Sequence, residues 1–238
     1  LIGTLNIIQS SLITQLRLQN SQSVPDLFLI DVQKDQVPGV KKLMKPHVKM
    51  AAPFSPLIRA RLTHINGKAI VVKASANMTM EERRRMRFLT REYSLSYKDK
   101  LNPSETILAG RFWKPGTTAP EISITEGLAR NLGVKVGGSL GFNIQGRLLK
   151  AKVTSLRRIN WASMLPNFFV VLPVKALEMA PQTLLTSVAM KSDKDRRIFQ
   201  RRLGNAYPNV TTLYITHDQR EAMAVADRMA VMAAGRFL

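Results

Sequence analysis

The sequence contains no cysteine, which excludes disulfides, thiolate nucleophiles and cysteine-ligated metal sites. It has only three histidines, His47, His64 and His217, and they are too far apart to form a locally spaced metal motif. It also lacks the Gly-x-Ser-x-Gly motif that presents a catalytic serine. We therefore expect no enzymatic activity, no metal and no cofactor, with His47 and His64 lying at the surface or at an edge.

Acidic residues are scarce: 16 Asp and Glu stand against 36 Lys and Arg, a formal net charge of +20. Such a surplus favours anionic partners, such as nucleic acid or phospholipid headgroups, but does not define a fold. A nucleic-acid-binding protein would usually add a helix-turn-helix, an RNA-recognition aromatic motif or zinc ligands, and none is evident. Nucleic acid is therefore an unlikely partner, although scattered charge could gather on one face after folding.

Long hydrophobic runs are absent as well, since no stretch approaches the roughly 20 apolar residues of a membrane-spanning helix. The nearest is residues 1–16, which polar residues such as Asn6 and Gln9 interrupt. Its helical spacing predicts a membrane-proximal helix or stalk over residues 1–20, continuing from a membrane helix. An ordinary amphipathic helix at a domain edge fits the pattern equally well.

The remaining sequence alternates between strand and helix signals. Asn66-Gly67 and Gln145-Gly146 each separate alternating segments, which predicts two β-hairpins. Helices are expected over residues 36–44 and 194–203. Further strands are expected over residues 27–32, 93–97, 106–109, 168–172 and 184–190. The predicted fold class is α+β, with mixed sheets, hairpins and short packing helices.

Two capping boxes mark further helices. Thr79 to Glu82 opens an arginine-rich helix, and Ser123 to Glu126 opens a second helix that Gly133 ends. The glycines of residues 133–139 do not form a phosphate-binding loop, because the lysine precedes the glycine pair and a strand follows.

Residues 121–142 (EISITEGLARNLGVKVGGSLGF) are similar to a recurrent piece of FtsX/MacB-type ABC transporter permeases. Residues 25–31, 95–113 and 153–173 resemble other segments of that family in the same order, so the resemblance covers about residues 1–213. One departure is Gly138, where the family more often carries an acidic residue.

This resemblance implies an extracytoplasmic domain with MacB-like periplasmic architecture, on the periplasmic side of the cytoplasmic membrane. It implies mechanotransmission: motion of a partner ABC ATPase subunit, received through the rest of the permease, would be coupled to export or handling of a lipid, lipoprotein or other hydrophobic cargo. Basic residues near a membrane would also be attracted to its anionic surface.

Residues 214–238 resemble a different protein, the switch-histidine end of an ABC ATPase. His217 matches the histidine that contacts the γ-phosphate in that family. The chain carries no Walker A loop and no Leu-Ser-Gly-Gly signature, so we expect His217 to be idle. The expected organisation is residues 1–20 as a stalk, 21–213 as one domain or two subdomains, and 214–238 as a tail. The alternatives are an incomplete ABC ATPase fragment and a basic nucleic-acid-binding protein.

Overall fold

The computed structural model describes residues 25–71, 79–215, 232–233 and 236–237. The chain forms two compact units. Unit 1 comprises residues 57–160 and 167–182, and unit 2 comprises the described residues of 8–56, 161–166 and 183–238. The helix predicted over residues 1–20 lies outside the described residues, and the domain borders at residues 20 and 213 stay predictions.

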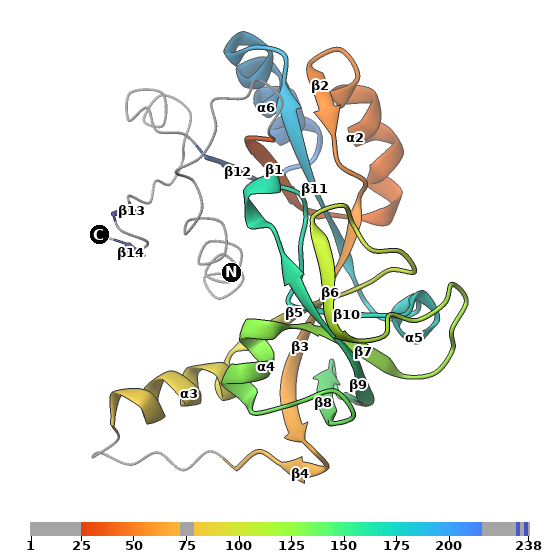
Figure 1. The fold of residues 1–238 in the computed structure, drawn as a ribbon. Helices are drawn as coiled ribbons and strands as arrows, with labels where there is room; N and C mark the ends of the chain where they lie inside the picture. Colours follow the sequence, from red (N-terminus) through yellow and green to blue (C-terminus); the bar gives the residue numbers. More distant parts are fainter. Residues whose placement is uncertain (1–24, 72–78, 216–231, 234–235, 238) are drawn as a thin grey trace. The chain divides into compact units, whose positions relative to one another are not determined.

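Unit 1 is built around a closed ring of paired strands (Figure 1). In order around the ring, the strands are β3 (Ser55–Ile65), β5 (Glu92–Tyr97), β10 (Val170–Leu172), β7 (Glu121–Thr125), β9 (Arg147–Ile159) and β8 (Ser139–Ile144), which pairs again with β3. The β5–β10 and β7–β9 pairs are parallel and the other four are antiparallel. Two shorter partners flank the ring: β4 (Lys68–Ala69) pairs with β3, and β6 (Glu105–Gly110) pairs with β9.

This closed six-stranded barrel corrects the predicted fold class. The expected α+β fold with mixed sheets and MacB-like periplasmic architecture is wrong, because the strands of unit 1 close on themselves. The closing pairs join residues far apart in sequence, such as Ile65 with Leu140 and Leu95 with Val170. Hairpin signals are local, so they identified strands without revealing that β3, the first strand of the ring, pairs with β8, the sixth.

Side chains fill the interior of the barrel. Every barrel strand contributes fully buried residues, including Ile58, Leu95, Ile124, Phe142 and Val153. A barrel of this size leaves room only for packed side chains. Helix α4 (Glu126–Leu132) buries Leu128, Ala129 and Leu132 in the same core, and α3 (Met80–Thr90) packs against α4. The short helix α5 (Val174–Leu177) follows β10.

The local sequence signals have mixed outcomes. Both hairpin turns are confirmed: Asn66 and Gly67 have φ of 50° and 77°, and Gln145 and Gly146 have 46° and 91°. These positive values are those of a tight hairpin turn.

The capping box at Thr79 is also confirmed, as is the left-handed stop at Gly133. The second capping box is wrong, because Ser123 lies inside β7 and α4 begins only at Glu126.

Unit 2 contains an antiparallel sheet in the order β12 (Thr211–Tyr214), β1 (Leu27–Val32), β11 (Thr183–Met190), β2 (Val48–Ala51). Helices α2 (Val37–Met44) and α6 (Asp193–Ala206) pack together and share a core with β1 and β11 (Figure 1). The predicted strands over 27–32 and 184–190 and helices over 36–44 and 194–203 are confirmed to within a few residues. Short elements complete the unit: the 3-10 turns η2 (Lys34–Gln36) and η3 (Trp161–Ser163), and the hairpin β13 (Met232–Ala233) with β14 (Arg236–Phe237).

Among the described residues, no helix is both long enough and apolar enough to cross a membrane.

Candidate functional site

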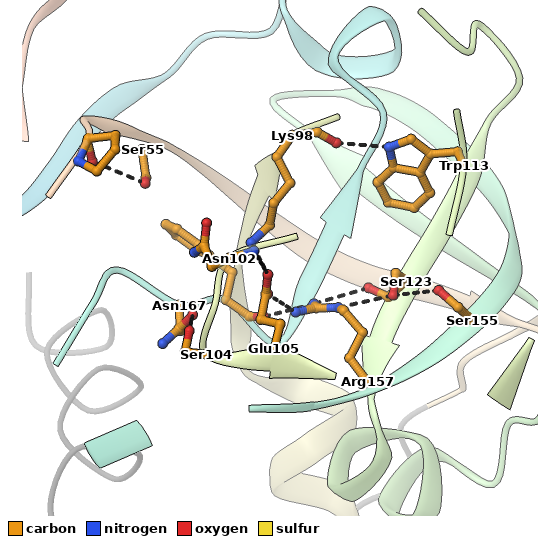
Figure 2. A network of polar contacts seen from close by, with 12 residues as sticks. Ser55, Lys98, Asn102, Ser104, Glu105, Trp113, Ser123, Ser155, Arg157 and Asn167 are labelled. Atoms are coloured by element: carbon orange, nitrogen blue, oxygen red, sulfur yellow. Dashed lines mark hydrogen bonds and ion pairs between the residues drawn. The ribbon is translucent and has the colours of Figure 1, made fainter. Parts of the chain in front are cut away.

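A buried polar cluster of unit 1 surrounds Arg157 in β9 (Figure 2). The side chains of Arg157 and Glu105 are fully buried, and Arg157 Nη1 donates to Glu105 Oε1. Lys98, just after β5, places its Nζ 2.6 Å from the other carboxylate oxygen, Glu105 Oε2. The Asn102 amide also donates to Oε2, at 2.8 Å. One carboxylate at the start of β6 thus holds two cations and one backbone amide.

The other donors of Arg157 are satisfied by β7 and by the segment that precedes β10. Its Nε donates to Ser123 Oγ in β7 at 3.0 Å, and its Nη2 donates to the Phe168 carbonyl at 2.9 Å. Ser155 Oγ donates to the same Ser123 oxygen at 2.7 Å. Figure 2 shows Glu105 and Ser123 in contact with the Arg157 guanidinium, and Ser155 in contact with Ser123. The cluster therefore links three adjacent strands of unit 1 through one buried cation.

The electrostatics of the cluster follow from its burial. Burial alone would raise the pKa of Glu105, but the charges of Arg157 and Lys98 outweigh it and hold that pKa below the usual carboxyl value. Burial lowers the pKa of Lys98, and the opposing effect of Glu105 offsets this only in part. Glu105 is therefore ionised in neutral solution, and its charge stabilises Arg157 in the interior.

This cluster has no geometry for catalysis. Ser123 accepts hydrogen bonds from Ser155 and Arg157, and neither can act as a base that would remove its proton. The zero exposure of the Arg157 and Glu105 side chains leaves no route for a substrate. The arrangement instead closes one part of the barrel wall. Sequence analysis did not predict this cluster. The signal was available, because Arg157 alternates along β9 with the same buried positions as Val153, Ser155 and Ile159.

Unit 2 brings together the three residue types of a catalytic triad, but in the wrong order. His47 Nδ1 lies 2.8 Å from Asp195 Oδ1, and Ser192 Oγ donates to Asp195 Oδ2 at 2.6 Å. A nucleophilic serine would have to meet the other imidazole nitrogen. In the described part of the chain, His47 Nε2 is buried and has no hydrogen-bond partner. Ser192 is instead the N-cap of α6, accepting from the Asp195 amide.

His47 was predicted to lie at the surface or at an edge; the surface position is wrong, because only 8% of the residue is exposed. The hydrogen bond from His47, followed by that from Ser192, lowers the pKa of Asp195. This pairing joins the segment after α2, three residues beyond its end, to the first turn of α6. We conclude that His47 stabilises the packing of α2 against α6.

The remaining sequence candidates stay separate. His64 Nδ1 lies 3.0 Å from the hydroxyl of the adjacent Thr63. His217, the residue with the ATPase resemblance, lies outside the described residues. Within the described residues, no group of three or more His, Asp or Glu side chains could hold a metal ion.

The glycine-rich turn lines a shallow open hollow together with Asn66 and Lys135. Its amides are engaged: Gly137 donates to the Val153 carbonyl, Gly138 to the Lys135 carbonyl and Ser139 to Asn66 Oδ1. These engaged amides cannot cradle a phosphate, which agrees with the interpretation of the sequence.

Comparison with known proteins gives two kinds of match. Over 187 residues the chain is 34% identical to an uncharacterised ABC transporter permease, YbbP, of Escherichia coli K12. This match covers 79% of the chain but 22% of the relative, so the chain spans about a fifth of that protein's length. A crystallised domain described as that of a permease protein from Porphyromonas gingivalis aligns with 87% of the chain and 98% of its own, at 11% identity and a TM-score of 0.37. No protein-family model matches the chain.

A shorter part of the chain is similar to ATP-binding proteins. Over 37 residues it is 60% identical to the sulfate/thiosulfate import ATP-binding protein CysA 2 of Chromobacterium violaceum, which is 16% of this chain and 9% of the relative. Over 67 residues it is 45% identical to the corresponding protein of Nocardia farcinica. Such a part is too short to supply a complete nucleotide-binding site.

Proposed function

We propose that this chain is part of an ABC transporter permease of the FtsX/MacB type, in a domain on the extracytoplasmic side of the membrane. Its role is mechanical: it transmits motion from a partner ATPase subunit to a lipid, lipoprotein or other hydrophobic cargo. The observation that carries this proposal is the 34% identity to a permease over most of the chain. It is also supported by the polar clusters of both units, which are built for holding strands and helices in place.

We further propose that the chain has no enzymatic activity of its own. The CysA-like similarity is the observation that favours the other candidate, an ATPase fragment. A switch histidine acts on a nucleotide that other parts of an ATPase hold, so His217 alone would have nothing to contact. Purified chain should therefore leave ATP unhydrolysed, and measurable hydrolysis above that of a His217→Ala variant would favour the ATPase candidate.

The absence of cysteine makes the location directly testable. Met179, which follows α5, is 91% exposed, so Met179→Cys gives a reactive thiol on the surface of unit 1. The substitution is made in the full-length gene product, which is expressed in Escherichia coli. The cells are then converted to spheroplasts and treated with a membrane-impermeant maleimide. We expect labelling of intact spheroplasts above the background of the unsubstituted protein.

Val171→Cys provides the matched control, because Val171 in β10 is fully buried. Its thiol should react only after denaturation, which shows that labelling reports exposure in a folded domain. If Met179→Cys reacts only after the spheroplasts are lysed, the domain faces the cytoplasm and the proposal fails.

A further inference from the structure

Unit 2 carries a strongly basic surface formed by α2 and α6. On α6, the exposed residues Lys194, Arg197 and Arg201 recur every three or four positions and so form one stripe. On α2 and the residue that follows it, Lys41, Lys42 and Lys45 are exposed as well. The opposite faces of both helices are buried in the core of the unit, through Val40 and Met44 of α2 and Phe199 and Leu203 of α6.

The two helices are held antiparallel by contacts at both ends. At one end, His47 pairs with Asp195, joining the residues after α2 to the first turn of α6. At the other end, Gly39 of α2 lies so close to the Tyr207 hydroxyl that a Cβ there would overlap it. The basic residues therefore stand on a single platform of fixed geometry, which we call the α2/α6 platform.

Acidic side chains near the platform are already engaged. Asp193 accepts from Arg196 Nη2 at 3.3 Å, and Asp195 is held by His47 and Ser192. The cationic side chains of Lys194, Arg197 and Arg201 are exposed to solvent. A concentration of mutually repelling charges on packed helices is unfavourable in isolation. An anionic partner offsets that repulsion.

We propose that the α2/α6 platform binds the anionic headgroups of a phospholipid membrane. This inference rests on the proposed function, because only a domain beside a membrane meets such a surface. In residues 25–56, 161–166 and 183–215 of unit 2, no aromatic residue is more than partly exposed, so this part offers nucleic-acid bases no exposed ring on which to stack. A headgroup layer needs only positive charge at a surface, which is what the two helices present.

The test measures partitioning of the purified chain onto vesicles by flotation. Vesicles of phosphatidylcholine alone are compared with vesicles containing one third phosphatidylglycerol, at several salt concentrations. We expect binding to the anionic vesicles, weakening as salt screens the charges, and little binding to the neutral ones.

The key variant combines Lys194→Gln, Arg197→Gln and Arg201→Gln. Each basic residue near an anionic surface contributes about a fivefold change in partitioning, so the triple variant should bind on the order of 100-fold more weakly. The matched control carries Arg147→Gln, Lys150→Gln and Lys152→Gln, which removes three exposed charges from β9 of unit 1. Circular dichroism of both variants checks that the fold is intact.

If both triple variants lose vesicle binding equally, net charge alone drives binding, and the proposal that the α2/α6 platform is the binding site is overturned. Absence of binding to anionic vesicles would overturn it too. Displacement of the vesicles by duplex DNA that binds through the same three residues would identify nucleic acid as the partner instead. None of these outcomes depends on the spheroplast labelling, so failure here is distinct from failure of the proposed location.

Discussion

Replacement of Glu105 by Gln should destabilise unit 1 out of proportion to its small change in shape. Glu105→Gln preserves size and leaves the hydrogen bonds from Arg157 to Ser123 and Phe168 in place. It removes the only carboxylate within ion-pair distance of the fully buried Arg157 in the described structure. Breaking a buried ion pair on one side costs about 3–5 kcal/mol, since an uncompensated charge remains inside. Because Gln can still accept a hydrogen bond, we expect the lower end, about 3 kcal/mol.

The assay follows unfolding of unit 1 through one tryptophan. Trp113 is 3% exposed, and its Nε1 donates to the Lys98 carbonyl at 2.8 Å, so its emission reports on the surroundings of the cluster. A Trp161→Phe background removes the second tryptophan from every variant. At about 2–4 °C per kcal/mol for a chain of this length, the transition should fall by roughly 6–12 °C.

The control is Glu178→Gln, which removes a carboxylate from the surface pair with Lys175. Exposed pairs contribute about 0–1 kcal/mol, so this transition should hardly move. A double variant, Glu105→Leu with Arg157→Met, should lose less stability than Glu105→Gln, because it leaves no unpaired guanidinium in the barrel wall. If Glu105→Gln lowers the transition temperature no more than Glu178→Gln does, the Arg157 charge does not depend on Glu105 as the structure indicates.

Four further outcomes are expected. Gly39→Ala should cost about 1–3 kcal/mol in urea denaturation, because its Cβ would meet the Tyr207 hydroxyl. Gly204→Ala, in α6 with open space around it, should instead stabilise by about 0.5–1 kcal/mol. Because the folded pKa of Glu105 is depressed, the stability from its charge is present above the unfolded value near pH 4 and is lost as pH falls further; unfolding midpoints of wild type and Glu105→Gln should therefore converge in acid. His217→Ala should leave both the unfolding transition and nucleotide-induced thermal shifts unchanged, as differential scanning fluorimetry can check.

Local signals in the sequence were enough to find most elements of this fold. The Asn66-Gly67 turn was predictable because both residues tolerate positive φ, and the same holds for Gln145-Gly146. Thr79 was recognisable because its partner Glu82 lies within one helical turn. In each case the interaction that fixes the structure joins residues a few positions apart.

The barrel and its buried cluster depend on longer-range contacts, which local patterns do not report. Ser123 matches a helix cap by spacing, yet Arg157, 34 residues away, uses its hydroxyl as an acceptor inside the sheet. The helix cap predicted at Ser123 therefore does not form, because the Ser123 hydroxyl is a hydrogen-bond partner of the buried Arg157. The sequence did contain one signal, an arginine at an inward-facing position of a long strand. A buried arginine needs a carboxylate nearby, but the strand pattern does not identify which one. Glu105 could be identified only once β6 was seen to pair with β9.

The border between the two sequence resemblances shows a related limit. The two resemblances predict a border near residue 213, but β12 continues through Tyr214, which pairs with Leu27, and the Ile215 amide donates to the Asp26 carbonyl. The Tyr214 ring also receives the Arg196 guanidinium, 3.8 Å from its centroid. Strand β12 pairs with β1 through backbone hydrogen bonds alone. Any extended segment whose alternate side chains suit the two faces of the sheet can therefore form this edge strand. A border predicted from sequence resemblance therefore need not coincide with the end of a structural element, since the border at residue 213 falls inside β12 (Thr211–Tyr214).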